Sequence, residues 1–168
     1  LSNFAAGVML LIFRPFKVGD MIVVAGRTGK VAEIDIFFTL IDTGDNRRLI
    51  IPNSQVFGAV IENVTFHPVR RADIPVGTPY GVDVDRVREV LEAAADATPG
   101  RDTSRPTQVV FVGFGPSSID WEVRVWAPTS DFAAVGQAAR RSVSHGLHAA
   151  GIGIPFPQLQ VHTQSVAA

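Results

Sequence analysis

The stretch FAAGVMLLIFRPFKVGD, residues 4–20, sets the first constraint on the fold. Its opening part is apolar and rich in good helix formers. Pro15 removes a backbone donor and pushes Arg14 out of the α region, so we expect the helix to end there. At 1.5 Å per residue, residues 1–13 reach roughly 20 Å, whereas a bilayer core needs about 20 apolar residues. We therefore expect either the last part of a membrane-spanning helix that begins upstream, or a buried helix.

Composition narrows the class of protein. The 168 residues suffice for one ordinary domain or two small ones. Charged residues make up only 18% of the chain, which indicates that part of the surface is covered by a partner. The net charge of -1 provides no overall basic field to hold nucleic acid. The absence of cysteine excludes a disulfide scaffold, thiol catalysis and cysteine-based zinc sites.

Residues 18–64 change to short β-rich runs. MIVVAG, GKVAEIDIFFTLIDT, RRLIIPN and AVIENV are separated by GRTG and TGDNR, whose Gly, Asp and Asn residues supply positive φ at hairpins. Several short strands in so few residues predict a small, strongly bent sheet or barrel. Pro52 and Asn53 mark a structural turn, where a strand ends and a short helical turn follows.

The HPVRR segment, residues 67–71, indicates a boundary, because the pattern after it changes. Strand, helix, strand, strand and helix follow in that order, which predicts an α/β sandwich with both helices on one side of the sheet. Asp83 is placed to cap the first helix, while Ser130 and Gly151 are placed to start and stop the second. The strand-like run 159–162 cannot be stable alone, so we expect it to add to this sheet or to assemble with copies of itself.

The sequence contains no familiar catalytic motif. The GFGPSS stretch, residues 113–118, follows a strand but lacks the helix N-terminus that a phosphate loop needs, so a hairpin turn is the better interpretation. His145 and His148 share a helix face, yet no third ligand occurs at a matching spacing. We therefore expect neither an enzyme nor a metal or cofactor site.

Six segments taken together resemble one family. They are LSNFAAGVMLLIFRPFKVGD (1–20), GKV (29–31), IPN (51–53), PVRR (68–71), SSIDWEVRVW (117–126) and AAGIGIPFPQ (149–158). Their order and spacing are similar to those of the small-conductance mechanosensitive channel family, MscS. The resemblance covers essentially the whole chain.

The resemblance implies a homo-heptameric channel that membrane tension opens, releasing ions and small osmolytes during hypoosmotic shock. It implies an α+β chain in four parts: the amphipathic second half of a pore-lining helix and its turn (1–17), an Sm-like β domain (18–66), a ferredoxin-like α/β sandwich (67–157), and a C-terminal strand and tail (158–168) that joins an intersubunit β-barrel. The expected location is the cell's inner membrane, with most of this chain on the cytoplasmic side. The family's leucine gate is expected upstream of Leu1.

The resemblance also assigns candidate gating and coupling residues. Gly7 matches a helix glycine that the family uses as a kink, and glycine is about 1 kcal/mol worse than alanine in a helix. Asn3 matches a polar position linked to contact between this helix and its neighbours. Phe13 and Phe16 are expected to dock the helix on the β domain, since aromatic side chains bury much area.

Arg14 and Lys17 are the candidate membrane-interface basic residues. Basic residues just beyond an apolar helix are typical of a cytoplasmic flank and would face anionic lipid headgroups. The alternative for such exposed charges is a solvated patch or local ion pairs.

Two other function classes remain open at this point. An Sm-like ring that binds RNA is permitted by the β domain, although the net charge and the scarcity of aromatic residues interleaved with basic ones disfavour it. A small-molecule sensor built on the sandwich domain has no pocket residues that the sequence identifies.

Overall fold

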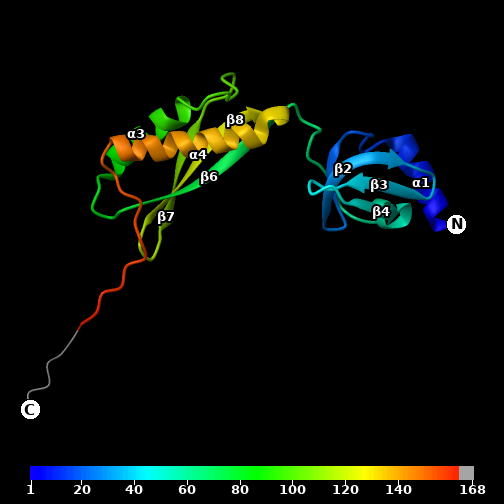
Figure 1. Cartoon of the computed structure of the whole chain (residues 1–168), viewed down its shortest axis with the longest axis horizontal. Helices are drawn as coiled ribbons and strands as arrows, with labels where there is room; N and C mark the ends of the chain where they lie inside the picture. The colour runs from blue at the N-terminus through cyan, green and yellow to red at the C-terminus, as the bar shows by residue number, and fades with distance from the viewer. Residues whose placement is uncertain (163–168) are drawn as a thin grey trace, which may run out of the picture. The chain divides into compact units, whose positions relative to one another are not determined.

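The computed structural model describes residues 1–162, and the chain divides into two compact units, Leu1–Pro68 and Val69–Ala168 (Figure 1). Each unit has a hydrophobic core of its own.

The first unit is a helix followed by a five-stranded antiparallel sheet in the order β4-β3-β2-β1-β5. A register shift between Val31 and Glu33 bends β2 against β3, which confirms the expectation of a small bent sheet. Within residues 1–162 the sheet stays open, with β4 and β5 as its edges. The elements are α1 (Ser2–Phe13), β1 (Met21–Val24), β2 (Arg27–Ile34), β3 (Phe38–Asp42), β4 (Arg48–Pro52), α2 (Asn53–Phe57) and β5 (Ile61–Asn63).

A two-residue turn joins β1 to β2. Val24 pairs with Arg27, and the two residues between them have positive φ, 49° at Ala25 and 71° at Gly26. Positive φ at both central residues is what a type I′ hairpin turn requires. The turn therefore supplies the twist that the strand pair needs, with alanine in a conformation that costs it energy.

The second unit is an α/β sandwich. Its three-stranded antiparallel sheet has the order β6-β8-β7, and its elements are β6 (Val69–Thr78), α3 (Val84–Asp96), β7 (Gln108–Phe114), β8 (Ile119–Pro128), a 3-10 turn (Thr129–Asp131) and α4 (Phe132–Ala149). This confirms the predicted order of elements. Every second residue of β8 is buried, and these side chains share one core with the buried faces of both helices. Both helices therefore cover the same face of the sheet (Figure 1).

The helix ends of the second unit test three predicted caps. Asp83 accepts hydrogen bonds from the amides of Asp85 (2.8 Å) and Arg86 (3.4 Å), so it caps α3 as predicted. Gly151, at φ 70°, ends α4 while the amide of Ile152 donates to the carbonyl of Leu147 at 2.9 Å. The prediction for Ser130 is wrong, because the chain makes a 3-10 turn there and the Ser130 hydroxyl donates to Asp131 instead.

The segment after α4 forms neither helix nor strand in residues 153–162. The amide of Gln158 donates to Ser117 Oγ at 3.1 Å, while Leu159 and Val161 are 87% and 67% exposed. A lone strand lacks ladder partners, so a β conformation at 159–162 needs a second chain. The strand of an intersubunit barrel stays a prediction, and its extension to 168 lies outside the described residues.

Candidate functional site

The sequence-derived candidates of the first unit converge on the contact between α1 and the β sheet. α1 turns Ala6, Gly7 and Leu10 inward, and the side chains of Ala6 and Leu10 are 7% and 1% exposed. Leu10 belongs to the core that includes Ile22, Val31 and Ile41 of the sheet. At about 25 cal/mol per Å² of apolar surface, burying a leucine contributes roughly 2 kcal/mol. α1 is therefore part of the first unit's fold.

Asn53 organises the sheet side of this contact. Its side chain is fully buried and accepts a hydrogen bond from Thr39 Oγ1 at 2.9 Å, while its amide nitrogen Nδ2 donates to the Asp35 carbonyl at 2.8 Å. Its backbone amide also donates to the Phe37 carbonyl at 3.0 Å. Pro52 ends β4 immediately before it, so the predicted strand end and helical turn are both present. Because the buried Asn53 has hydrogen-bond partners for its side chain and its backbone amide, it holds the 35–37 turn in one position.

Asn3 connects α1 to α2. Its side-chain oxygen Oδ1 accepts a hydrogen bond from the backbone amide of Ser54 at 3.1 Å. That amide lies in the first turn of α2, whose own N-cap, Pro52, supplies no side-chain bond. Asn3 therefore satisfies a helix-start donor that has no partner within its own helix.

Gly7 is the point of closest approach between α1 and the sheet. A Cβ atom added there would lie 2.0 Å from the carbonyl oxygen of Ile36 and 2.7 Å from Asn53 Nδ2. The helix runs unbroken from Ser2 to Phe13, so Gly7 does not kink it in this structure. The glycine is needed because the backbone of the 35–37 turn occupies the space of a side chain.

The two phenylalanines that were expected to dock the helix differ. Phe16 is 2% exposed and packs in the core of the first unit, as expected. Phe13 is 66% exposed, so the expectation that it docks on the β domain is wrong for this chain. Phe13 is the last residue of α1, and the chain leaves the helix at Arg14 in the left-handed conformation, so the Phe13 side chain lies outside the core that contains Leu10.

Arg14 ends α1 in the left-handed conformation, with φ 46° and ψ 57°. Its amide donates to the Leu10 carbonyl at 3.0 Å and its Nε to the Leu11 carbonyl at 3.2 Å, which satisfies two terminal carbonyls. Neither Arg14 nor Lys17 forms an ion pair with any residue from 1 to 162. Ile12, Phe13 and Val18, which are close to them in the chain, are exposed apolar residues, and the exposed Phe66 lines the same hollow as Arg14 and Lys17.

Asp20 fixes the turn that follows. Its carboxylate accepts hydrogen bonds from the Lys17 amide (3.0 Å), Asn63 Nδ2 (2.9 Å) and Thr65 Oγ1 (3.3 Å). Desolvation works against ionisation, but these hydrogen bonds together outweigh it and hold the pKa of Asp20 below its ordinary value of 3.8. The turn is thus tied to β5 by an ionised carboxylate at neutral pH.

Sequence reasoning missed the sheet-side partners of α1. Ser54, the carbonyl of Ile36, and Phe37, whose ring lies 6.2 Å from that of Phe4, were not singled out. The only signal was the polar Asn3 at the start of an apolar run, which calls for a polar partner without identifying it. Each partner is distant in sequence from the α1 residue that it contacts: the separation is 29 residues for Gly7 and Ile36 and 51 residues for Asn3 and Ser54.

The remaining candidates from the sequence are the histidines and the GFGPSS stretch. Within residues 1–162, no three His, Asp or Glu side chains are arranged to hold a metal ion. The GFGPSS stretch is a hairpin turn between β7 and β8, in which the Gly115 amide donates to the Ser118 carbonyl at 2.7 Å. None of the helices formed by residues 1–162 has the length and apolar character required to span a membrane.

Comparison with known proteins gives the same family over both units. Residues 1–66 match the family "Mechanosensitive ion channel, beta-domain", and residues 72–154 match "Mechanosensitive ion channel MscS, C-terminal". A small-conductance mechanosensitive channel from Edwardsiella ictaluri is 40% identical over 164 residues, which is 96% of this chain and 57% of that protein. An uncharacterised MscS family protein from Synechocystis is 36% identical over 96% of this chain and 55% of its own length.

Solved structures agree. The closed-state crystal structure of Helicobacter pylori MscS superposes with a TM-score of 0.90 at 32% identity, covering 98% of this chain and 66% of that one. Arabidopsis thaliana MSL1 has a TM-score of 0.76 at 14% identity, over 91% of this chain and 57% of its own, and supports the fold alone. The fold defines the class as a two-part module of mechanosensitive channel proteins. The chain belongs to the MscS family, and it spans little more than half the length of the curated relatives it matches.

Proposed function

We propose that this chain is the cytoplasmic part of an ion channel subunit that membrane tension opens, so that ions and small osmolytes leave the cell during hypoosmotic shock. The family membership supports the channel class, and relatives that it matches are named small-conductance mechanosensitive channels. The functional unit is a ring of identical chains, a heptamer, in the cell's inner membrane. Nucleic acid and enzymatic chemistry have no part in it.

The observation that carries this proposal is the asymmetry of α1. One face is locked to the sheet by the Asn3–Ser54 hydrogen bond and by the close approach at Gly7, while Ile12 and Phe13 are two-thirds exposed. A helix that is firmly attached on one side and apolar on the other can transmit a displacement of the membrane to the sheet below. Arg14 and Lys17, which form no ion pair within residues 1–162, supply the positive charges that anionic headgroups attract.

Tension needs no chemistry to open such a channel. It favours whichever state occupies the larger area in the membrane plane, so two packings of different area are sufficient. In this proposal α1 and the turn from Arg14 to Lys17 move as one body with the sheet, because Asp20 ties that turn to β5.

Patch recordings under a suction ramp test the proposal. Membranes that contain the protein should show a weakly selective current that appears only above a threshold tension, and cells that express it should survive a hypoosmotic downshift better than cells without it. A protein that inserts in the membrane at normal levels but passes no tension-dependent current would contradict the proposal.

A further inference from the structure

The second unit presents an exposed aromatic side chain that the core holds rigidly. Phe114, at the tip of the β7–β8 hairpin, is 76% exposed. Its ring stacks on that of Tyr80 at 6.4 Å and meets the edge of Phe111 at 5.2 Å, and Phe111 in turn contacts the buried Trp121. The Tyr80 hydroxyl donates to the Gly115 carbonyl, which pins the hairpin tip. We call Phe114 and Tyr80 the aromatic knob.

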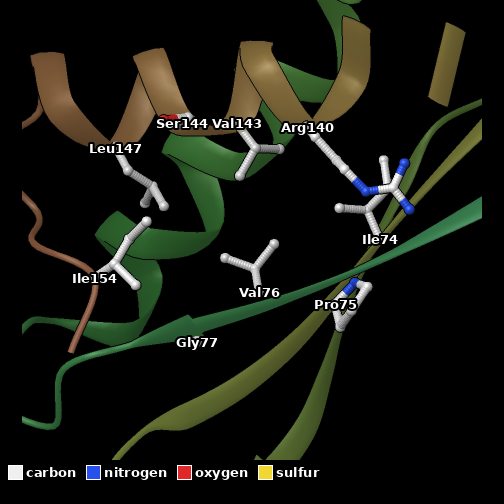
Figure 2. Close-up of a pocket in the computed structure, with 9 residues that line it drawn as sticks. All are labelled: Ile74, Pro75, Val76, Gly77, Arg140, Val143, Ser144, Leu147 and Ile154. Atoms are coloured by element: carbon white, nitrogen blue, oxygen red, sulfur yellow. The ribbon is translucent and has the colours of Figure 1, made fainter. Parts of the chain in front are cut away.

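An apolar groove lies at the opposite edge of the same sheet. Figure 2 shows Val76 of β6, Val143 and Leu147 of α4, and Ile154 directed into one space between strand and helix. We call this the β6–α4 groove. β6 and β7 are the two edge strands, with β8 between them, so groove and knob lie on opposite edges of the three-stranded sheet.

The size of the groove indicates what it holds. Its free volume of about 190 Å³ is below the roughly 300–1,000 Å³ of typical small-molecule sites, and it suits a single large side chain. Pro75 sits on the edge strand beside it and has no N–H to offer, so an added β-strand would find no donor at that position. The small volume and the missing donor both favour a side chain over an added strand as the occupant.

Arg140 selects an aromatic occupant. It lines the groove at the end near Ile74 (Figure 2), donates through Nη1 to the Gly136 carbonyl at 3.1 Å, and forms no ion pair with any residue from 1 to 162. A guanidinium at the wall of an apolar slot is attracted to the face of an aromatic ring, which an aliphatic side chain cannot provide.

We infer that the aromatic knob of one copy inserts Phe114 into the β6–α4 groove of the next copy. Because the two surfaces differ and lie on opposite edges, the contact is head-to-tail, and a contact of this kind closes into a ring when the rotation between successive copies is a whole fraction of a turn. The Phe114 side chain already packs against Tyr80 and Phe111 in the free chain, so it loses little conformational freedom when it binds. The inference rests on the function proposed above only in requiring a ring of identical chains.

Cysteine cross-linking tests this contact cleanly, because the chain has no cysteine of its own. Pro116→Cys at the hairpin tip and Ser144→Cys beside the groove are introduced together in the intact protein, and a short bis-maleimide is applied. A head-to-tail ring gives a ladder of dimer, trimer and larger species on a denaturing gel. Each single substitution gives no such ladder, and neither does the control pair Pro116→Cys with Glu92→Cys, since Glu92 lies on α3 outside the groove.

Substitution of the knob gives a second readout in the doubly cysteine-substituted protein. Phe114→Ala should lower the cross-linking yield at least about tenfold, as expected for truncating an anchor residue. Phe114→Tyr, which keeps the ring, should restore most of it, and Phe114→Leu should not. A yield that is the same for Leu and Tyr would overturn the aromatic selection by Arg140.

The remaining outcomes separate this inference from the channel proposal. A dimer band alone shows a two-fold contact and overturns the inference, as does the absence of cross-links in a protein whose native mass is oligomeric. If the cysteine at position 144 is protected from maleimide labelling but forms no cross-link, something else occupies the groove, and the inference is also overturned. Tension-activated current in the unsubstituted protein then decides the channel proposal independently, and a monomeric native mass contradicts both.

Discussion

The side chain of Asn3 accepts a hydrogen bond from the backbone amide of Ser54, 51 residues further along the chain. One side-chain oxygen thus joins the start of α1 to the start of α2. The bond also gives the proposed membrane element a specific attachment to the sheet, and each part of that attachment can be changed separately.

Asn3→Ala removes the acceptor and leaves the Ser54 amide without a partner. By analogy with the loss of a helix cap, this should destabilise the first unit by about 1 kcal/mol. Hydrogen exchange measured by mass spectrometry should show faster exchange at residues 53–57. Asn3→Asp keeps an acceptor and should exchange much more slowly than the alanine variant. Equal protection in all three proteins would show that the bond contributes nothing.

Gly7→Ala tests whether Gly7 serves the helix or the contact. Alanine improves helix propensity by about 1 kcal/mol, but its Cβ would meet the Ile36 carbonyl at 2.0 Å, and overpacking of this kind costs about 1–3 kcal/mol. We expect the contact to dominate, so that the first unit loses stability and tension-dependent gating changes. Ala5→Gly, at an exposed position of the same helix, isolates the propensity effect. A Gly7→Ala protein with a more stable first unit would contradict this explanation.

Phe13 and Phe16 form a matched pair. Phe16→Ala empties a buried site and should cost about 3–5 kcal/mol, whereas Phe13→Ala at an exposed site should change stability by less than about 0.5 kcal/mol. In patch recordings, Phe13→Ala should nevertheless shift the threshold tension, because its side chain belongs to the proposed membrane-facing surface. Both tryptophans and the tyrosine lie in the second unit, so tryptophan fluorescence reports that unit and serves as the internal control.

The stability of the first unit should depend on pH through Asp20. Its folded-state pKa lies below 3.8, so the unfolded chain binds the proton more readily. The stabilisation is therefore complete above the unfolded pKa and is lost as pH falls through the folded value. The stability difference between the wild type and Asp20→Asn should shrink as the pH is lowered from 6 towards about 3. A difference that grows on acidification would reverse the assigned direction.

Local patterns predicted much of this architecture because the forces that they report are local. Asp83 caps α3 and Gly151 ends α4, since each depends on backbone groups within four residues. The β7–β8 hairpin and the turn at Pro52 follow from turn chemistry in the same way. Ser130 failed as a cap because the chain makes a 3-10 turn before α4, a small backbone choice that residue preferences do not resolve.

The candidate site was predictable only in part. Asn3, Gly7 and Asn53 could be singled out as residues, but their contacts depend on how α1 packs on a sheet whose 35–37 turn is distant in sequence. Phe13 and Phe16 look equivalent in the sequence, and the left-handed turn at Arg14 separates them into an exposed and a buried residue. Tertiary packing decides which of two such residues is buried, and local sequence patterns do not report tertiary packing.

The β1–β2 turn contains a residue that can be replaced to stabilise the first unit. Alanine at φ 49° is one of the poorer residues for a position that asparagine or glycine occupies at much lower cost. Ala25→Asn should therefore raise the melting temperature of the first unit without touching α1 or the groove. A sturdier scaffold of this kind would tolerate the destabilising changes needed to probe Asn3 and Gly7.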